Sequence, residues 1–279
     1  MRKLIACLRF LSVFAYSCGA LFVSLFILPG AEDTKRGRIV KSWNKRILRW
    51  LGVRVEASGA DAFDDLVRGC GVTKGRMGRL IVSNHISFLD IFSLNTQLPS
   101  QFVAKAEISK WPVFGTIAKA VGTIFIDRGN RRALVGIADR MGDELQLGRS
   151  LLMFPEGTTS DGTGLLRLHP NLFEAAVRSQ AEVIPVVLRY ESRGEICREA
   201  AYTGKVGLFA CLWHIVNIPD LTVHVRILPA IKPEGDRREV CAQVSRAMSE
   251  ALGVADPLTE ETAEPIPQKA APQQEAVHA

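Results

Sequence analysis

The sequence predicts an α/β fold: a single mixed sheet flanked by helices, with an N-terminal helical segment associated with a membrane. Three observations predict it. Short apolar runs that favour strands alternate along the chain with segments of helical periodicity. The length of 279 residues is enough for one sizeable core. Finally, residues 10–29 carry no charge, and these 20 residues are about the number needed to cross the apolar part of a bilayer.

The N-terminal apolar run follows Arg2, Lys3 and Arg9, a charge pattern shared by membrane anchors and secretory signal peptides. We favour the anchor because no clear small-x-small cleavage site precedes Ala31. Positive charge on both sides of the run leaves its orientation open under the positive-inside rule. The segment either crosses the membrane or forms a helical hairpin within one leaflet.

Residues 35–51 form a basic amphipathic stretch that includes Trp43 and Trp50. Lys and Arg alternate there with large apolar residues, which suits an anionic lipid surface. The alternative is a solvated helix that packs its apolar side on the protein. With the preceding run, this stretch predicts a membrane-anchoring segment over residues 1–56.

A histidine and an aspartate lie around a predicted turn in the sequence NHISFLD, residues 84–90. Residues 80–82 are apolar and predict a buried strand, and a helical pattern begins at Ser87. Residues five apart on one helix or one strand point away from each other, so only a turn lets His85 meet Asp90. Such a pair can take a proton from a hydroxyl group. The alternative is a capping box, in which Ser87 and Asp90 close the first turn of the helix.

Three further segments follow in order. Residues 122–128 (GTIFIDR) are a strand that ends in an acid and an arginine, residues 154–160 (FPEGTTS) follow the apolar run 151–153, and residues 183–187 are another buried run. Together with NHISFLD these segments resemble the glycerolipid acyltransferase family, which includes the 1-acyl-sn-glycerol-3-phosphate acyltransferases. The family pattern is NHxSxxD, GxxFIDR, FPEGTRS and then an apolar segment containing proline. The resemblance covers about residues 80–190.

The resemblance implies that His85 deprotonates the free hydroxyl of a lysolipid and that Asp90 supports it. The hydroxyl then attacks the thioester of acyl-CoA or acyl-carrier protein, without a covalent acyl-enzyme. Carried over by motif, Arg128 binds the polar head of the acceptor, while Glu156 and Gly157 shape the acceptor site. The implied roles of two other residues are less specific: Pro185 contributes to the core or to a wall facing the acyl chain, and Lys105 adds positive charge. Each cation has an ordinary alternative as a solvated or ion-paired side chain.

The chain departs from the family pattern in two places. Thr159 replaces the arginine of FPEGTRS, and residues 168–171 (LHPN) replace a basic segment found in many relatives. Both changes remove positive charge where an acceptor phosphate would lie. Lysophosphatidic acid is still the first acceptor we expect, giving phosphatidic acid for phospholipid biosynthesis. A lyso-ornithine lipid is the second.

Two other classes of function are alternatives to an acyltransferase. A membrane lipid-binding protein that has lost the reaction would have no need of both His85 and Asp90. A serine hydrolase finds little support because the chain has no GxSxG elbow and Ser87 lies only two residues after His85.

Composition adds limits on cofactors and partners. The six cysteines have no metal-ligand spacing, and no metal site or bound cofactor is predicted. The formal net charge of +6 suits an anionic membrane as well as nucleic acid, but the basic residues cluster beside the membrane signals. We therefore expect membrane lipids as partners, not nucleic acid, and an inner-membrane location with the catalytic domain on the cytoplasmic side.

The C-terminal part of the chain predicts a strand over 221–227 and a closing helix over 237–252. Beyond them the sequence is rich in Pro, Ala, Gln and Glu, with few large apolar residues. The catalytic domain is accordingly placed at residues 57–254, and residues 255–279 are predicted to be a disordered tail.

Overall fold

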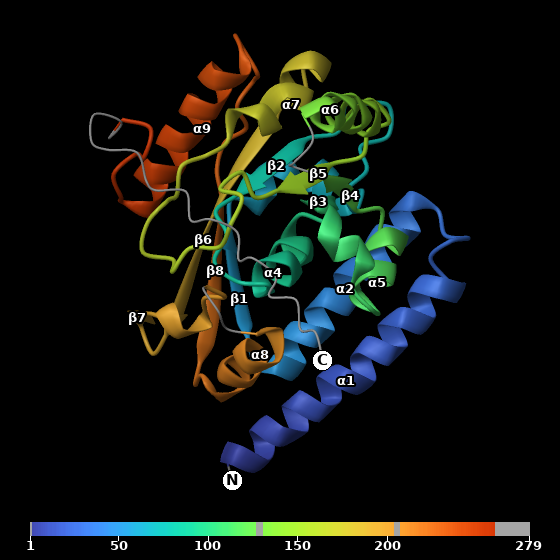
Figure 1. The fold of residues 1–279 in the computed structure, drawn as a ribbon, viewed down its shortest axis with the longest axis vertical. Helices are drawn as coiled ribbons and strands as arrows, with labels where there is room; N and C mark the ends of the chain where they lie inside the picture. Colours follow the sequence, from blue (N-terminus) through green and yellow to red (C-terminus); the bar gives the residue numbers. More distant parts are fainter. Residues whose placement is uncertain (1, 127–130, 204–206, 260–279) are drawn as a thin grey trace, which may run out of the picture.

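The protein forms one mixed sheet with helices on both faces, as predicted (Figure 1). The structure is a computed structural model that describes residues 2–126, 131–203 and 207–259. The strands are β1 (Arg54–Ser58), β2 (Leu80–Ser83), β3 (Gln101–Lys105), β4 (Ile124–Ile126), β5 (Leu151–Met153), β6 (Val183–Ser192), β7 (Glu195–Ile196) and β8 (Leu221–Ile227). The predicted strands at 80–82, 151–153, 183–187 and 221–227 are confirmed.

The helices alternate with these strands. They are α1 (Arg2–Phe26), α2 (Asp33–Leu51), α3 (Asp64–Arg68), α4 (Leu89–Gln97), α5 (Phe114–Ala120), α6 (Arg131–Gln146), α7 (Glu174–Ser179), α8 (Leu208–Asn217) and α9 (Arg237–Leu252). Short 3₁₀ turns lie at Ala60–Phe63, Ala106–Lys110, Pro170–Phe173 and Arg198–Ala200. The closing helix has the predicted limits, and a capping box between Asp236 and Glu239 fixes its start.

The strand order β1-β8-β6-β2-β5-β3-β4 places the parallel strands together. β2 lies between β5 and β6, and β3 and β4 continue the sheet, all in the same direction. Only the pairings of β6 with β8 and of β6 with β7 are antiparallel within the described residues. The carboxyl ends of β2, β5, β3 and β4 therefore meet at one edge, where ligands of open α/β sheets bind.

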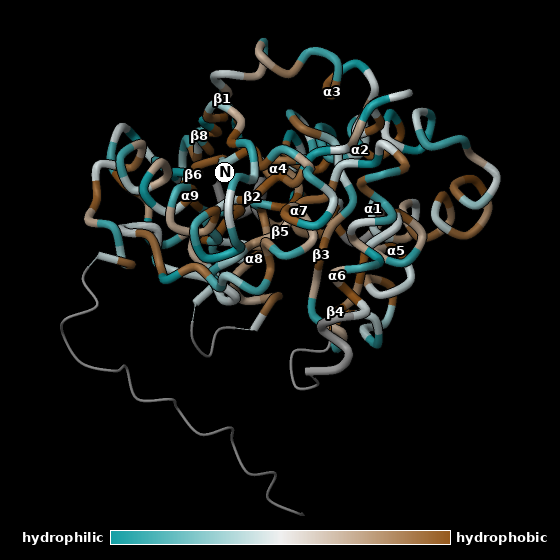
Figure 2. Tube along the Cα trace, turned by 90° about the horizontal axis from the view of Figure 1, so that it is seen from above, coloured by the Kyte–Doolittle hydropathy of each residue, from teal (hydrophilic) through white to brown (hydrophobic). Residues whose placement is uncertain are grey.

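Each face of the sheet buries its own core. Along β2, Ile81 belongs to the core beneath α2, α4 and α8, whereas Leu80 and Val82 belong to the core beneath α6, α7 and α9. This alternation follows from the two-residue period of a strand. Figure 2 shows the hydrophobic residues concentrated on the central strands and on the helices that cover them.

α1 lies outside these layers, against α2, α5 and α8 (Figure 1). The Tyr16 hydroxyl donates a hydrogen bond of 2.8 Å to the Trp43 carbonyl of α2, and the two rings are 4.5 Å apart. Residues 7–26 are long and apolar enough to cross a membrane by length and composition, and only 6% of the most apolar stretch is buried. The N-terminal helix is thus attached to the protein on one side only.

α2 uses its apolar side inside the protein. Ile47, Leu48 and Leu51 are buried in the core with α4, while Trp50 is exposed. These three residues pack as the alternative of a helix resting its apolar side on the protein expects. Five basic residues of α2 are exposed, namely Lys35, Arg38, Lys45, Arg46 and Arg49. β1 begins at Arg54, so the limit proposed at residue 56 falls inside a strand. Of the expected tail, residues 260–279 lie outside the described residues.

Candidate active site

His85 and Asp90 meet at the carboxyl end of β2. The chain turns after Ser83, and α4 begins at Leu89, so the two side chains face each other across the turn. His85 Nδ1 and Asp90 Oδ2 are 2.7 Å apart. Asp90 is fully buried, whereas 21% of the His85 side chain is exposed. The histidine can therefore reach a substrate while its partner stays out of water.

The Asp90 carboxylate is held by four donors. Oδ2 accepts from the backbone N–H groups of Ile86 (2.7 Å) and Ser87 (2.9 Å) as well as from the His85 ring. Oδ1 accepts from the Tyr190 hydroxyl on β6 at 2.5 Å. Hydrogen bonds to ionised groups are strong, so this set fixes the carboxylate in position.

Only one of the two hydrogen bonds of the capping box expected for Ser87 and Asp90 is present in the described residues. The Asp90 side chain does reach back to the Ser87 N–H, but the buried Ser87 hydroxyl makes no hydrogen bond within the described residues. α4 has no side-chain cap at its first residue. The same carboxylate therefore orders the turn and orients His85, and the two interpretations are not exclusive.

Two contacts tie this turn to the rest of the fold. The Asn84 amide donates to the Leu188 carbonyl (3.0 Å) and accepts from the Leu188 N–H (2.7 Å), which extends the β2–β6 pairing by one side chain. The Ser160 N–H donates to the His85 carbonyl at 2.7 Å. The first and third sequence motifs are thus joined directly at the backbone of His85.

The His85 ring stacks on Phe154, the first residue after β5. The ring centroids are 3.9 Å apart and the planes are 11° from parallel. Stacking and the Asp90 contact together fix both the tilt and the rotation of the imidazole. Since Nδ1 donates to the carboxylate in the neutral ring, the lone pair lies on Nε2, the atom that can accept a proton from a hydroxyl group.

Glu156 lies beneath this pair and is buried, with 3% of its surface exposed. The backbone N–H groups of His85 and Leu166 face its carboxyl group, but neither makes a hydrogen bond of ordinary geometry with it. Burial, with a smaller contribution from the Asp90 charge, raises the pKa of Glu156 from 4.5 to about 8. Near neutral pH it is a neutral acid that can donate a hydrogen bond.

This pKa makes stability depend on pH. The folded state keeps the Glu156 proton up to about pH 8, whereas the unfolded chain releases it near 4.5, so the free energy of unfolding falls as pH rises through that window. Each pKa unit corresponds to about 1.4 kcal/mol. We expect Glu156→Gln to flatten the fall in melting temperature between pH 5 and pH 9, roughly the window given by these two pKa values.

Thermal unfolding in detergent across that pH range tests this expectation. Glu250→Gln, at an exposed carboxylate near the end of α9, is the matched control and should keep the wild-type pH dependence. A Glu156→Gln curve parallel to the wild-type curve would show that the buried carboxyl does not hold its proton.

The other predicted site residues fall into three groups. Gly157 has φ +76°, a left-handed conformation that disfavours any side chain, and Pro185 is buried within β6. Lys105 is exposed at the carboxyl end of β3, two strands from β2. Arg128 lies outside the described residues.

Thr159, which replaces the family arginine, is used within the loop. Its hydroxyl donates to the Tyr202 carbonyl, and the Tyr202 N–H in turn donates to the Ile86 carbonyl at 2.8 Å. The short side chain therefore stabilises the loop beside the turn and brings no charge to it.

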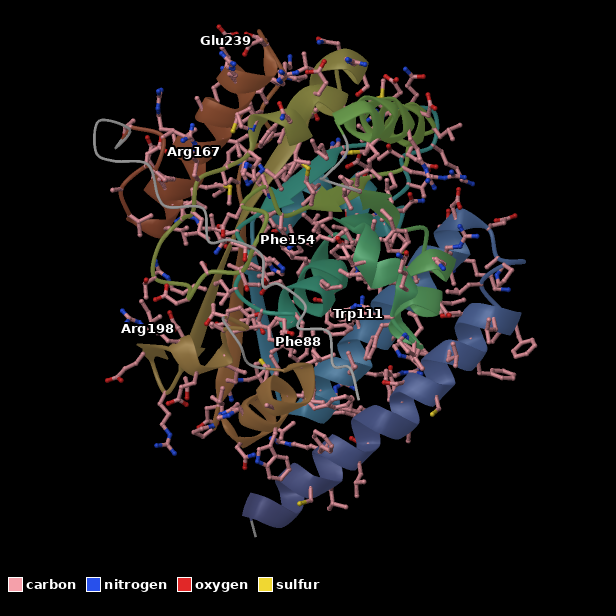
Figure 3. The ribbon with its side chains drawn as sticks, in the orientation of Figure 1. Phe88, Trp111, Phe154, Arg167, Arg198 and Glu239 are labelled. Carbon is pink, nitrogen blue, oxygen red and sulfur yellow. The ribbon has the colours of Figure 1, made fainter. Side chains whose placement is uncertain are left out.

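Sequence reasoning missed the roles of Tyr190 and Phe154. Tyr190 is a hundred residues from Asp90, and the only local signal is a polar-tipped aromatic residue in an apolar strand. Phe154 was part of a motif, but stacking on His85 depends on how β2 and β5 lie side by side. Figure 3 shows Phe154 in the middle of the molecule, with Phe88 between it and α8.

The fold and the site define a protein of the α/β class that holds a histidine, oriented by a buried carboxylate, at the carboxyl edge of its sheet. The chain belongs to the acyltransferase family. The family's sequence profile matches residues 67–189. A lyso-ornithine lipid O-acyltransferase of Pseudomonas aeruginosa is 34% identical over 262 residues, which cover 92% of this chain and 96% of that protein.

The chain is also similar to a second curated protein and to a solved structure. A 1-acyl-sn-glycerol-3-phosphate acyltransferase of Neisseria meningitidis is 42% identical over 149 residues, 53% of this chain, and the match spans only 58% of that protein. The crystal structure of the 1-acyl-sn-glycerophosphate acyltransferase of Thermotoga maritima has the same fold. Its TM-score is 0.65 at 20% identity, and the match covers 91% of this chain and 97% of that one.

Proposed function

We propose that this protein is a lysolipid O-acyltransferase that uses His85 as its general base. The observation that carries the proposal is the His85–Asp90 contact of 2.7 Å, at a partly exposed histidine and a fully buried aspartate. Nε2 takes the proton as the lysolipid oxygen attacks the thioester carbonyl. The carbon–sulfur bond then breaks, and the imidazolium returns the proton to the leaving thiolate. The products are an ester and a free thiol.

Asp90 acts on this step through charge and orientation. It holds the Nδ1 proton in place and stabilises the imidazolium that forms during attack. Glu156, neutral near pH 7 and buried, shapes the acceptor side of the site from beneath the His85–Asp90 pair. Arg128 and Lys105 are the cations we assign to the acceptor head: Lys105 is the last residue of β3, which ends at the edge where His85 lies, and Arg128 is carried over from the family motif.

Two acceptors are supported by different observations. Lysophosphatidic acid is our first candidate, because the relative from Neisseria with that specificity in its name has 42% identity over the matched segment. A lyso-ornithine lipid is the second, because the relative that aligns along 96% of its length carries that name. The uncharged Thr159 also favours an acceptor without phosphate.

Acyl transfer by the purified full chain in detergent decides between them. Labelled acyl-CoA and acyl-carrier protein are each offered with lysophosphatidic acid or with lyso-ornithine lipid. We expect the lysophosphatidic acid product to form at least about tenfold faster, a difference of about 1.4 kcal/mol in transition-state binding. The reverse preference would assign the enzyme to the ornithine lipid, and no product with either acceptor would contradict the proposed function.

We also propose that the protein works at the cytoplasmic face of the inner membrane, with α1 lying along one leaflet. The contacts of α1 with α2 and α8 hold it against the domain, and most of the basic residues of α2 are exposed. A helix held along the domain in this way is suited to the hairpin within one leaflet. Both acyl donors are cytosolic thioesters, which supports the same side.

A further inference from the structure

α8 presents two large aromatic side chains to the outside. The exposed fractions are 71% for Phe209 and 40% for Trp213. The opposite side of the helix is buried in the core and consists of Cys211, Leu212, Ile215 and Val216. Neighbouring large aromatic side chains exposed on a folded domain point to an interaction site.

The outer side of α8 continues into the outer side of α1. The Trp213 and Phe10 rings meet edge to face at 5.8 Å, and the Arg9 guanidinium donates to the Val216 carbonyl at 3.4 Å. On α1, Leu8 and Leu11 are exposed by 58% and 66%. Figure 1 shows the two helices side by side at the lower edge of the molecule. Leu8, Leu11, Phe209 and Trp213 are exposed apolar residues of these two contacting helices, and together they are called the α1–α8 surface.

Charge beside this surface indicates what covers it. A Cβ atom at Gly52, just after α2, would lie 2.4 Å from the Arg9 guanidinium, so the end of α2 adjoins the same part of α1. That end carries the exposed Trp50 and a group of exposed basic residues, Lys45, Arg46 and Arg49. An apolar surface with tryptophan and basic residues at its rim fits the interface of a bilayer that contains anionic lipids.

We infer that α8 is a second membrane-inserting element and that Phe209 and Trp213 enter the same leaflet as α1. This inference rests on the membrane association proposed above. α8 belongs to the catalytic domain, about 200 residues from α1. A domain that inserts at both α1 and α8 cannot turn about the long axis of α1 relative to the membrane. The two elements therefore fix how the carboxyl edge of the sheet faces the lipid.

Sedimentation of the purified full chain with vesicles of phosphatidylethanolamine and phosphatidylglycerol tests the inference. Phe209→Asp should weaken vesicle binding by at least about tenfold, because a charge replaces an inserted ring. Phe209→Leu should bind like the wild type. Leu147→Asp is the matched control: Leu147 is 64% exposed just after α6, which covers the opposite face of the sheet from α8, and its replacement should leave binding unchanged.

Equal binding of wild type and Phe209→Asp would overturn the role of α8 and leave the membrane location intact. No binding by the wild type would overturn both. Phe209→Ser, which adds no charge, and a thermal unfolding curve for each variant separate loss of insertion from loss of folding.

Tyr190 carries a second, independent inference. It is fully buried, and its hydroxyl lies 2.5 Å from Asp90 Oδ1, the oxygen that His85 does not contact. β6 reaches this position because it continues past the end of β2, where Ser83 pairs with Val186. Burial, together with the Asp90 charge, raises the pKa of Tyr190 well above its usual value, so it remains a donor at every working pH.

We propose that Tyr190 is a positioning residue that acts on the reaction through Asp90. Tyr190→Phe should lower kcat by roughly tenfold with KM unchanged, the effect of one charge-assisted hydrogen bond. If the effect passes through Asp90, the same substitution in an Asp90→Asn background should change kcat by less than about twofold, because linked residues are not additive.

Ser245→Ala is the control for this double-mutant cycle. Ser245 lies on α9, and its hydroxyl donates to Asp256 at 2.6 Å, so its loss also removes a hydroxyl-to-carboxylate bond but away from the site. It should affect stability and leave kcat unchanged. An active wild type with a fully active Tyr190→Phe variant, or equal effects in both backgrounds, would overturn the role of Tyr190. An inactive wild type would instead contradict the proposed function.

Discussion

Replacing His85 with alanine is expected to reduce kcat for acyl transfer by about 10³-fold or more, the largest effect of any single substitution in the site. The reason is that the base placed to accept the hydroxyl proton is removed, while the strands that position the substrates stay in place. The side chain is partly exposed and stacks on Phe154, so its loss costs little packing. KM for the lysolipid should therefore change little.

Initial rates with labelled acyl-CoA, together with lysolipid binding by the same preparations, measure this effect. His224→Ala is the matched control, because that histidine lies on β8 beside Glu56 and Glu191 and outside the site. It should keep wild-type turnover. A His85→Ala variant with both turnover and binding intact would contradict the role of His85, and loss of both would show that the residue is structural.

Asp90→Asn is expected to lower kcat by about 10²-fold to 10⁴-fold, the second large effect. The amide oxygen can keep the three donors on the His85 side, and the amide nitrogen can donate to the Tyr190 oxygen. The geometry therefore survives while the charge that stabilises the imidazolium is lost. Alanine is unsuitable here, because it leaves the Ile86 and Ser87 N–H groups buried without partners at about 1–3 kcal/mol each.

The measurement for Asp90→Asn is again the initial rate, taken with a thermal unfolding curve. Asp139→Asn removes a carboxylate that pairs with Arg178 on the surface, and it should leave turnover unchanged. Wild-type turnover in a folded Asp90→Asn variant would mean that the carboxylate only orders the turn, as the capping interpretation holds.

The strands and the closing helix could be predicted because their local patterns agree with the fold. Residues 80–82 are all apolar, so the side chains that point to either face of the sheet are apolar, and all three are buried. The His85–Asp90 pair was also within reach of sequence reasoning, since the spacing of five requires a turn. These features depend on neighbours in the chain.

Other features depend on which strands lie side by side. Tyr190 meets Asp90 only because β6 pairs with β2 and runs beyond it. The charge state of Glu156 follows from burial, which a motif alone does not give. For α2, the sequence showed both an apolar side and a basic side, and only the packing of Ile47 and Leu48 under the domain decides which surface each side meets.

The central claim is that His85 activates the acceptor hydroxyl for direct attack on the thioester. Release of free thiol from the acyl donor, followed with and without lysolipid, tests it most directly. With His85 as the base for direct attack, thiol should appear only when lysolipid is present and should match the new ester mole for mole. Thiol release without acceptor would contradict it, because the bond would then break by attack of water or of a protein nucleophile.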